Sequence, residues 1–255
     1  MRDIILNETT KAAALLTGAA KVEDVRAAIS LLARYDIQAA GIEKAAARAH
    51  VRKTIRKLYP SVPAARIDTL VDHYVEHGDE YPLLDLGGVP ITQREIDVVC
   101  AREGIRAKCL TFALLALAKF DTMRFPGVDY WYNGERWNEL YKRANLVLSE
   151  DDMCYMLHDL YKDNHIGLAT RIDNCSMHVL FADPDGEPVM LLNEQDYKDL
   201  GYCLRAYLGE KYTRCEECGR WVKQNVRGKP RRFCADCAAD NQRASNSAYM
   251  RRIRQ

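Results

Sequence analysis

Four cysteines near the C-terminal end of this 255-residue chain occur as two closely spaced pairs. Cys215 and Cys218 are separated by two residues, and after fifteen more residues Cys234 and Cys237 repeat that spacing. Two thiolates at this spacing can reach one ion, and Zn²⁺ at structural sites prefers four tetrahedral ligands with thiolates at about 2.3 Å. The pattern predicts one structural Zn²⁺ ion, which leaves no open position for catalysis. The alternative is that the two pairs take part in redox chemistry.

The residues around the cysteines indicate how such a small module is built. Gly219 directly follows the second cysteine and permits the left-handed backbone that a metal-binding turn requires. We expect a short hairpin between the two pairs, with residues 220–225 as the first strand, 228–230 as the turn and 231–233 as the return strand. A module of this size has little core, so metal binding should supply most of its folding free energy, about 10–16 kcal/mol in model fingers.

The other five cysteines occur singly in apolar patterns. They are Cys100, Cys109, Cys154, Cys175 and Cys203. The odd total of nine, with no secretion signal, argues against a disulfide framework. We therefore expect these five to behave as small buried apolar residues.

Positive charge is concentrated in the same C-terminal segment. Residues 211–255 contain twelve Lys or Arg and four Asp or Glu, a net charge of +8, which leaves −7 on the other 210 residues. Guanidinium groups match phosphate oxygens, so this segregation favours nucleic-acid binding over a merely solvated face. The predicted nucleic-acid-binding residues are Arg220, Lys223, Arg227, Lys229, Arg231, Arg232, Arg243, Arg251, Arg252 and Arg254.

Two further features of the sequence bear on that interpretation. The aromatic residues Trp221 and Phe233 could stack on single-stranded bases or could form the core of the module. A second basic face, formed by Arg52, Lys53 and the pair Arg56 and Lys57, could contact phosphates or simply be solvated.

Apolar periodicity predicts a fold that is mainly α-helical with small β-structure (α+β). Residues 22–35, 42–59 and 64–77 have helical spacing, which predicts a helical domain over residues 1–80. The glycines and prolines of residues 78–90 indicate a linker.

The middle of the chain predicts a second domain over residues 91–185. Thr92 and Glu95 have the pattern of a helix capping box, and Gly104 separates that helix from an apolar one. The expected elements are helix 105–120, strand 128–132, helices 135–144 and 149–162, and strands 166–172 and 176–182. This order is that of a winged helix. A connecting segment, 186–210, with a helix at 194–208, leads to the zinc module, 211–255.

The third helix of this domain is acidic, although a winged helix normally places that helix in the DNA groove. It contains Glu150, Asp151, Asp152 and Asp159 against a single lysine. Carboxylates repel phosphates, so we expect a scaffold or a protein-contact surface rather than a reader of bases.

The residues of the cysteine module also carry a resemblance. The string Cys-x-x-Cys-Gly-x-Trp from Cys215, the string Arg-Arg-Phe-Cys-x-x-Cys-Ala from Arg231 and the arginine-rich end resemble CGNR-type and related phage zinc fingers, in which a basic helix follows the last cysteine pair. The motif Cys-Gly-Asn-Arg itself is replaced by Cys-Ala-Ala-Asp from Cys237. The whole chain, with its helical start, winged-helix-like middle and C-terminal zinc ribbon, resembles a group of proteins of Firmicute phages and mobile elements. The resemblance implies a biological context but no mechanism.

These patterns favour a zinc-dependent nucleic-acid-binding accessory or regulatory protein that binds DNA or RNA. A second hypothesis is an adaptor or inhibitor that contacts a bacterial protein machine through its acidic body. An enzyme is the weakest interpretation, because the sequence contains no Gly-rich phosphate loop, nucleophile motif or His–Glu metal motif. The longest apolar stretch, residues 109–118, is too short to span a bilayer, which predicts a cytoplasmic protein without membrane contact.

Overall fold

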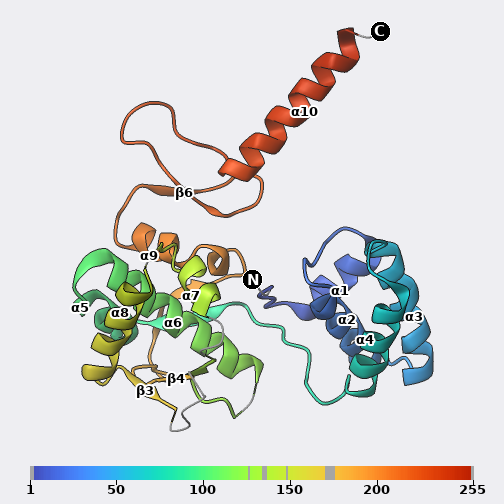
Figure 1. The fold of residues 1–255 in the computed structure, drawn as a ribbon, viewed down its shortest axis with the longest axis horizontal. Coiled ribbons are helices and arrows are strands. Elements are labelled where there is room, and N and C mark those ends of the chain that lie inside the picture. The colour runs from blue at the N-terminus through green and yellow to red at the C-terminus, as the bar shows by residue number, and fades with distance from the viewer. Residues whose placement is uncertain (1–2, 126, 134–136, 148, 170–175, 254–255) are drawn as a thin grey trace. The chain divides into compact units, whose positions relative to one another are not determined.

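The computed structural model describes residues 3–125, 127–133, 137–147, 149–169 and 176–253 (Figure 1). The chain forms two compact units, Met1–Gly88 and Val89–Gln255. Helices predominate, and the described strands form three small antiparallel sheets. The predicted class, mainly α-helical with small β-structure, is therefore confirmed.

The first unit is entirely helical in its regular elements. These are α1 (Glu8–Thr17), α2 (Val25–Arg34), the π-helix η1 (Tyr35–Ala39), α3 (Lys44–Leu58) and α4 (Ala64–Glu76). The apolar positions that predicted three of these helices are the ones that pack together: Ile29 of α2, Val51 of α3 and Val71 of α4 are fully buried in one cluster. Helical periodicity was sufficient here because each helix buries a single stripe.

The second unit begins with a strand and two helices. They are β1 (Val89–Thr92), α5 (Gln93–Ala101) and α6 (Gly104–Arg124). The capping box is confirmed: the Glu95 N–H donates to Thr92 Oγ1 at 3.3 Å and the Thr92 N–H donates to Glu95 Oε2 at 2.8 Å. Gly104, with a φ of 74°, is the first residue of α6 and has a left-handed conformation where the two helices meet. Thirteen consecutive residues of α6, Cys109 to Asp121, are buried, so this helix is the centre of the unit.

A three-stranded sheet follows α6. Its strands are β2 (Trp131–Tyr132), β3 (Ile166–Leu168) and β4 (Met177–Val179). Helices α7 (Trp137–Arg143) and α8 (Glu150–Lys162) lie between β2 and β3 in the sequence. The strands pair antiparallel in the order β2-β4-β3. Ser149 caps α8 as expected by accepting a hydrogen bond from the Asp152 N–H at 3.2 Å. The predicted strands 166–172 and 176–182 are shorter in the structure, and residues 170–175 lie outside the described ranges.

Two expectations about the connecting segments are wrong. Residues 89 and 90, assigned to a linker, belong to β1, which pairs with β5 (Pro188–Leu192). The helix expected at 194–208 is instead the 3₁₀ turn η3 (Asp196–Lys198) followed by α9 (Leu200–Tyr207). The reason is local: Asn193 Oδ1 accepts from the Gln195 N–H at 2.9 Å and Asp196 Oδ2 accepts from the Asn193 N–H at 2.9 Å, which stabilises a turn in place of a helix.

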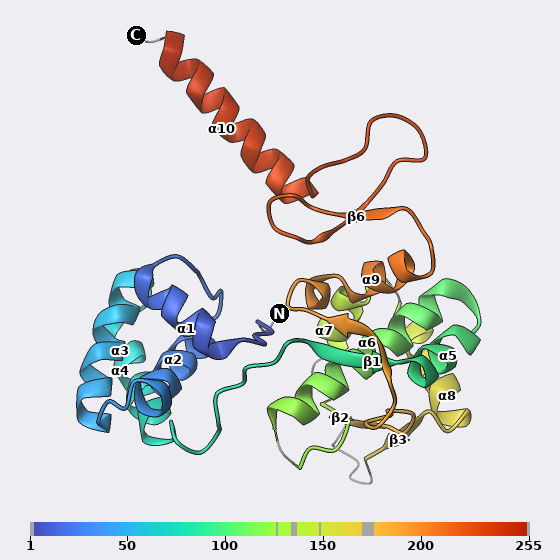
Figure 2. The ribbon, with the colours of Figure 1, turned by 180° about the vertical axis from the view of Figure 1, so that it is seen from behind.

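The C-terminal elements also differ from the expected hairpin. They are β6 (Tyr212–Arg214), β7 (Trp221–Lys223) and α10 (Ala235–Ile253). β7 pairs with β6, with Arg214 opposite Trp221, so the hairpin encloses the first cysteine pair and the predicted return strand at 231–233 is wrong. Figure 2 shows α10 (red) extending away from the β6–β7 hairpin. No described helix has an apolar stretch long enough to cross a membrane.

Candidate metal centre

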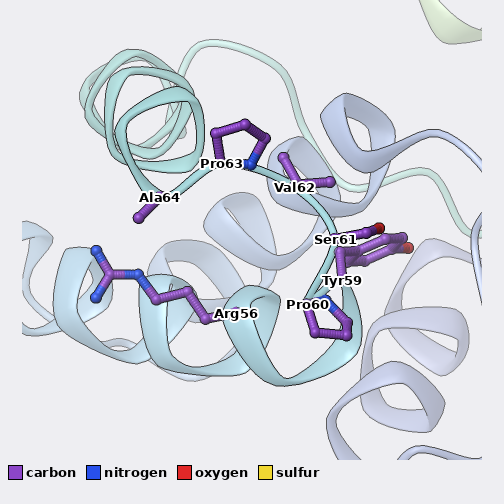
Figure 3. Close-up of a pocket in the computed structure, with 7 residues that line it drawn as sticks. All are labelled: Arg56, Tyr59, Pro60, Ser61, Val62, Pro63 and Ala64. Atoms are coloured by element: carbon purple, nitrogen blue, oxygen red, sulfur yellow. The ribbon is translucent and has the colours of Figure 1, made fainter.

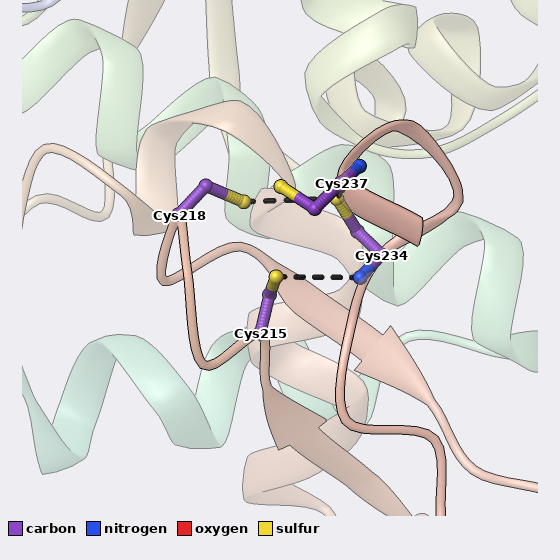
Figure 4. Close-up of side chains that lie close together, drawn as sticks. All are labelled: Cys215, Cys218, Cys234 and Cys237. Atoms are coloured by element: carbon purple, nitrogen blue, oxygen red, sulfur yellow. Dashed lines mark hydrogen bonds between the residues drawn. The ribbon is translucent and has the colours of Figure 1, made fainter. Parts of the chain in front are cut away.

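The four paired cysteines meet at one point of the C-terminal module (Figure 4). Their Sγ atoms all lie within 4.8 Å of one another, and Cys218 Sγ is 3.6 Å from Cys234 Sγ. Tetrahedral thiolates at about 2.3 Å from an ion stand about 3.8 Å from each other. The spacing of the sulfurs therefore fits a single tetrahedral ion, and this group could hold a metal.

The first pair lies in the turn between β6 and β7. Cys215 follows β6, and its N–H donates to Arg220 O at 2.8 Å. The Gly219 N–H donates to Cys215 O at 2.9 Å, and Gly219 has a φ of 70°. The left-handed glycine expected after Cys218 is thus present, and it allows the chain to turn back so that both sulfurs face the same point.

The second pair lies at the beginning of α10. The Cys234 N–H donates to Cys215 Sγ at 3.3 Å, and the Cys237 N–H donates to Cys234 Sγ at 3.5 Å. The first turn of a helix has unpaired N–H groups and a partial positive charge, which favour thiolates. The start of α10 therefore positions two of the four cysteines.

Electrostatics within the cluster also favour a cation. Burial raises the pKa of the Cys215 thiol, but N–H groups from Cys218, Cys234 and Glu217 outweigh it and lower that pKa to about 6. Burial raises the pKa of Cys218, and the thiols of Cys234 and Cys218 raise the pKa of Cys237. Four thiolates this close repel one another, and a bound cation removes that repulsion.

The module has only a very small apolar core. Cys215, Val222 and Cys234 are buried, and Phe233 packs against them. Phe233 thus has the core role that the sequence left open. Since so few apolar side chains are buried, a metal ion held by the four cysteines would supply much of the folding free energy.

Two buried carboxylates attach the module to the rest of the second unit, which sequence reasoning missed. Asp196 and Asp199 are each 2% exposed. Arg220 donates from Nε and Nη2 to Asp199 at 2.8 and 3.0 Å, and its Nη1 lies 3.1 Å from Asp236 in the first turn of α10. The Arg220 guanidinium therefore links the turn that contains Cys215 and Cys218 to Asp199 in the rest of the second unit and to Asp236 in α10. The sequence had predicted that Arg220 binds nucleic acid.

Asp196 forms the second attachment. It accepts a hydrogen bond from Trp221 Nε1 at 2.9 Å, and it forms an ion pair with Arg214. The Arg214 guanidinium also lies over the Trp221 ring, 3.9 Å from its centroid. Trp221 is thus engaged with the body of the unit, and a role in base stacking is not needed to explain it. No short-range pattern in the sequence could have shown this contact, because Asp196 and Trp221 pair only after folding.

Replacing Asp199 by Ala should lower the free energy of unfolding of the metal-loaded chain by about 2–4 kcal/mol. The substitution leaves Arg220, half-buried, without its principal partner. Asp236→Ala is the matched control, because Asp236 contacts the same guanidinium but its side chain is 79% exposed; it should cost less than about 1 kcal/mol. Urea denaturation measures both, and equal losses for the two variants would show that Asp199 does not attach the module.

The remaining basic residues of the module divide into paired and unpaired groups. Arg232 pairs with Glu216, and Arg243 pairs with Asp240. The following are exposed and have no ion pair within the described ranges: Lys223, Arg227, Lys229, Arg231 and Arg251. The side chain of Arg252 and all of Arg254 lie outside the described residues.

Three of the unpaired cations belong to one loop, residues 225–231, whose base is closed by a side chain. Gln224 Nε2 donates to Arg231 O at 3.0 Å, and the Arg231 N–H donates to Gln224 Oε1 at 2.8 Å. These two hydrogen bonds close the base of the loop, and Arg227 and Lys229 lie exposed between its ends, where they can approach an anionic surface.

Two of the four residues of the second basic face, in the first unit, are neutralised by ion pairs. Arg52 pairs with Asp72 and Asp68 of α4, and Arg56 donates to Asp68 at 2.8 and 2.9 Å. Lys53 and Lys57 are exposed. A 360 Å³ pocket lies at the turn between α3 and α4 (Figure 3), but Arg56, the one charged side chain among its lining residues, is already bound to Asp68.

The four single cysteines that the structure describes, Cys100, Cys109, Cys154 and Cys203, take no part in the cluster, and Cys100 is only partly buried. Cys109 and Cys203 are buried as expected, and burial raises the pKa of Cys109 to about 11. Cys154 is exposed on α8, which contradicts the expected burial, because only Leu160 of that helix is buried among its described side chains. Cys175 lies outside the described residues.

Comparison with known proteins adds no further constraint. No protein-family model matches the sequence, and no curated protein or solved structure is significantly similar to it.

Proposed function

We propose that this chain is a non-catalytic, zinc-dependent nucleic-acid-binding accessory or regulatory protein of the phage or mobile-element type, acting in the cytoplasm. The observation that carries the proposal is the pairing of a four-cysteine centre with exposed, unpaired cations on the same module. A metal bound to the four cysteines would hold the base of the loop and the start of α10 together, and three of these cations, Arg227, Lys229 and Arg231, belong to that one loop. Phosphate oxygens are the ligands that such cations bind best.

Zn²⁺ is the metal that we assign to the cysteine cluster. Four thiolates in tetrahedral spacing are a donor set that zinc prefers, and the cytoplasm keeps such thiols reduced. A turn between two strands provides one pair, and the start of a helix provides the other, which is a zinc-ribbon or treble-clef-like arrangement. The ion would be structural, because all four coordination positions come from the protein.

We also interpret residues 104–179 as winged-helix-like. The order α6, β2, α7, α8, β3, β4 and the strand order β2-β4-β3 support this. The helix that would enter a DNA groove, α8, has exposed Asp151, Asp152 and Asp159, so this part would be a scaffold for the basic module.

A salt titration tests the proposed function. The metal-loaded full chain is titrated with single- and double-stranded DNA and RNA. The logarithm of its affinity should fall linearly with the logarithm of the salt concentration. Each phosphate contact contributes slightly less than one to the slope on duplex DNA. Absence of binding to all four probes at low salt would refute the proposal.

Reversing the charge of α8 should not impair this binding. Asp151→Lys with Asp152→Lys removes two carboxylates that repel phosphates, so specific binding should be unchanged and non-specific binding equal or tighter. The same titration measures the effect, and circular dichroism confirms that the fold persists. Loss of binding by a folded variant would mean that α8 contacts the nucleic acid.

A second function, a protein-binding adaptor or inhibitor of a bacterial protein machine, is favoured by the surface of α8. Tyr155 and Tyr161 are 71% and 49% exposed on this acidic helix, and large exposed aromatic side chains mark protein-contact surfaces. Tyr155→Ala with Tyr161→Ala should release a bacterial partner in a pull-down if this function is correct, and should leave nucleic-acid binding intact if it is not.

A further inference from the structure

Helix α10 has no buried face after its first turn. Every residue from 238 to 251 is exposed, and Figures 1 and 2 show the helix running free of the β6–β7 hairpin. With 19 residues it is about 28 Å long. Helices in proteins owe most of their stability to packing. Beyond that turn, the described contact with another part of the second unit is the hydrogen bond from Asn241 to Glu217, near the start of the helix, so the rest of this surface is available to a binding partner.

The exposed surface of α10 has a polar centre. Ala239, Gln242, Asn246 and Tyr249 follow one another three or four residues apart, so they lie along one face. Helices that bind protein grooves carry apolar anchors at these positions. In α10 the two central positions are amides, and Gln242 Nε2 donates to Asn246 Oδ1 at 2.9 Å. This face suits a partner that presents hydrogen-bonding groups.

The edges of base pairs in duplex DNA present such groups. Gln and Asn side chains bind adenine through its N6 and N7 atoms, and the major groove, about 12 Å wide, admits one α-helix. The major groove of an RNA duplex is too deep and narrow for side chains to read. A polar helix without stacking residues at its centre is equally unsuited to single strands. The chemistry of α10 therefore selects duplex DNA.

The beginning of the helix is firmly held. Cys237 lies in its first turn, Arg220 joins Asp236 to the buried Asp199, and Asn241 Nδ2 donates to Glu217 at 3.1 Å. A helix that is already oriented loses little conformational freedom when it binds. The exposed cations of the loop at residues 225–231 belong to the same module and can contact the phosphates of the bound DNA.

We propose that α10 binds in the major groove of duplex DNA and that Gln242 and Asn246 contact base edges there. This inference rests on the proposed nucleic-acid-binding function and adds the groove, the reading element and two specificity-determining residues. Arginines at the end of the helix and in the loop then supply the sequence-independent contacts with phosphates.

The test is a selection with the metal-loaded full chain from a pool of duplexes that have a randomised central segment. We expect enrichment of one consensus, and interference by methylation of purines in its major groove. Gln242→Ala with Asn246→Ala should lower affinity for the selected duplex by about 10- to 100-fold, toward that for the unselected pool, with an unchanged salt slope. Alanine favours helices, so α10 should remain folded in this variant.

The matched control is Ser247→Ala, which removes an exposed hydrogen-bonding side chain outside the polar face; it should retain the preference for the consensus. Binding without any sequence preference, a preference that survives Gln242→Ala with Asn246→Ala, or interference confined to the minor groove would each overturn the inference and leave the nucleic-acid-binding function standing. Absence of all binding would instead refute that function, and the inference with it.

Discussion

Replacing Cys234 by Ser is expected to reduce the zinc content of the purified chain from one ion to nearly none and to unfold residues 211–255. Cys234 is a buried member of the cluster, and its sulfur also accepts the Cys237 N–H. Structural zinc supplies about 10–16 kcal/mol in small fingers, and the small apolar core of this module cannot replace that amount. Metal analysis and protease digestion of the tail measure the two effects.

Cys154→Ser is the matched control, because Cys154 is exposed and lies outside the cluster. It should retain one zinc ion and a protease-resistant module. The first unit should also keep its thermal transition in the Cys234→Ser variant, since its core is formed within residues 1–88. Full zinc occupancy in Cys234→Ser would contradict the assigned ligand set.

Deleting residues 249–255 is expected to have the largest effect on nucleic-acid affinity that leaves the metal centre intact. The deletion removes Arg251, Arg252 and Arg254. If each neutralises one phosphate, the slope of log affinity against log salt should fall by up to about three, and affinity at 0.1 M salt by two to three orders of magnitude, almost equally for all sequences. Titration at several salt concentrations measures both quantities.

The control replaces the same three arginines by lysines. Charge is retained, so the salt slope should change little even if bidentate contacts with phosphates are lost. Zinc content and thermal stability should be unchanged by the deletion, because Tyr249, Met250 and Arg251 are exposed. An unchanged slope after the deletion would show that the end of α10 does not contact phosphates. The adaptor function predicts no nucleic-acid affinity in either chain and a partner protein retained by both.

Short-range sequence patterns were sufficient to predict the parts of the structure that depend on contacts between residues close in sequence. The spacing of Cys215 and Cys218 determines that both sulfurs face one point, because a turn with Gly219 in a left-handed conformation returns the chain on itself. The capping box of Thr92 and Glu95 marks the start of α5 because its two hydrogen bonds span only three residues. Helical periodicity located α3 and α4 for the same reason.

Contacts between distant residues could not be predicted in this way. β1 pairs with β5 about a hundred residues later, and neither strand alternates clearly enough to be recognised alone. β7 pairs with β6, and no sequence rule chose that partner over residues 231–233.

The basic residues show most clearly where the sequence is insufficient. The sequence by itself determined that residues 211–255 contain four paired cysteines and a net charge of +8. Only the tertiary structure decided which charges are used internally: Arg220 is bound to Asp199, Arg214 to Asp196, and Arg227 remains exposed. The physical reason is that a buried carboxylate needs a cationic partner, and which guanidinium can reach it depends on how the module packs against the body.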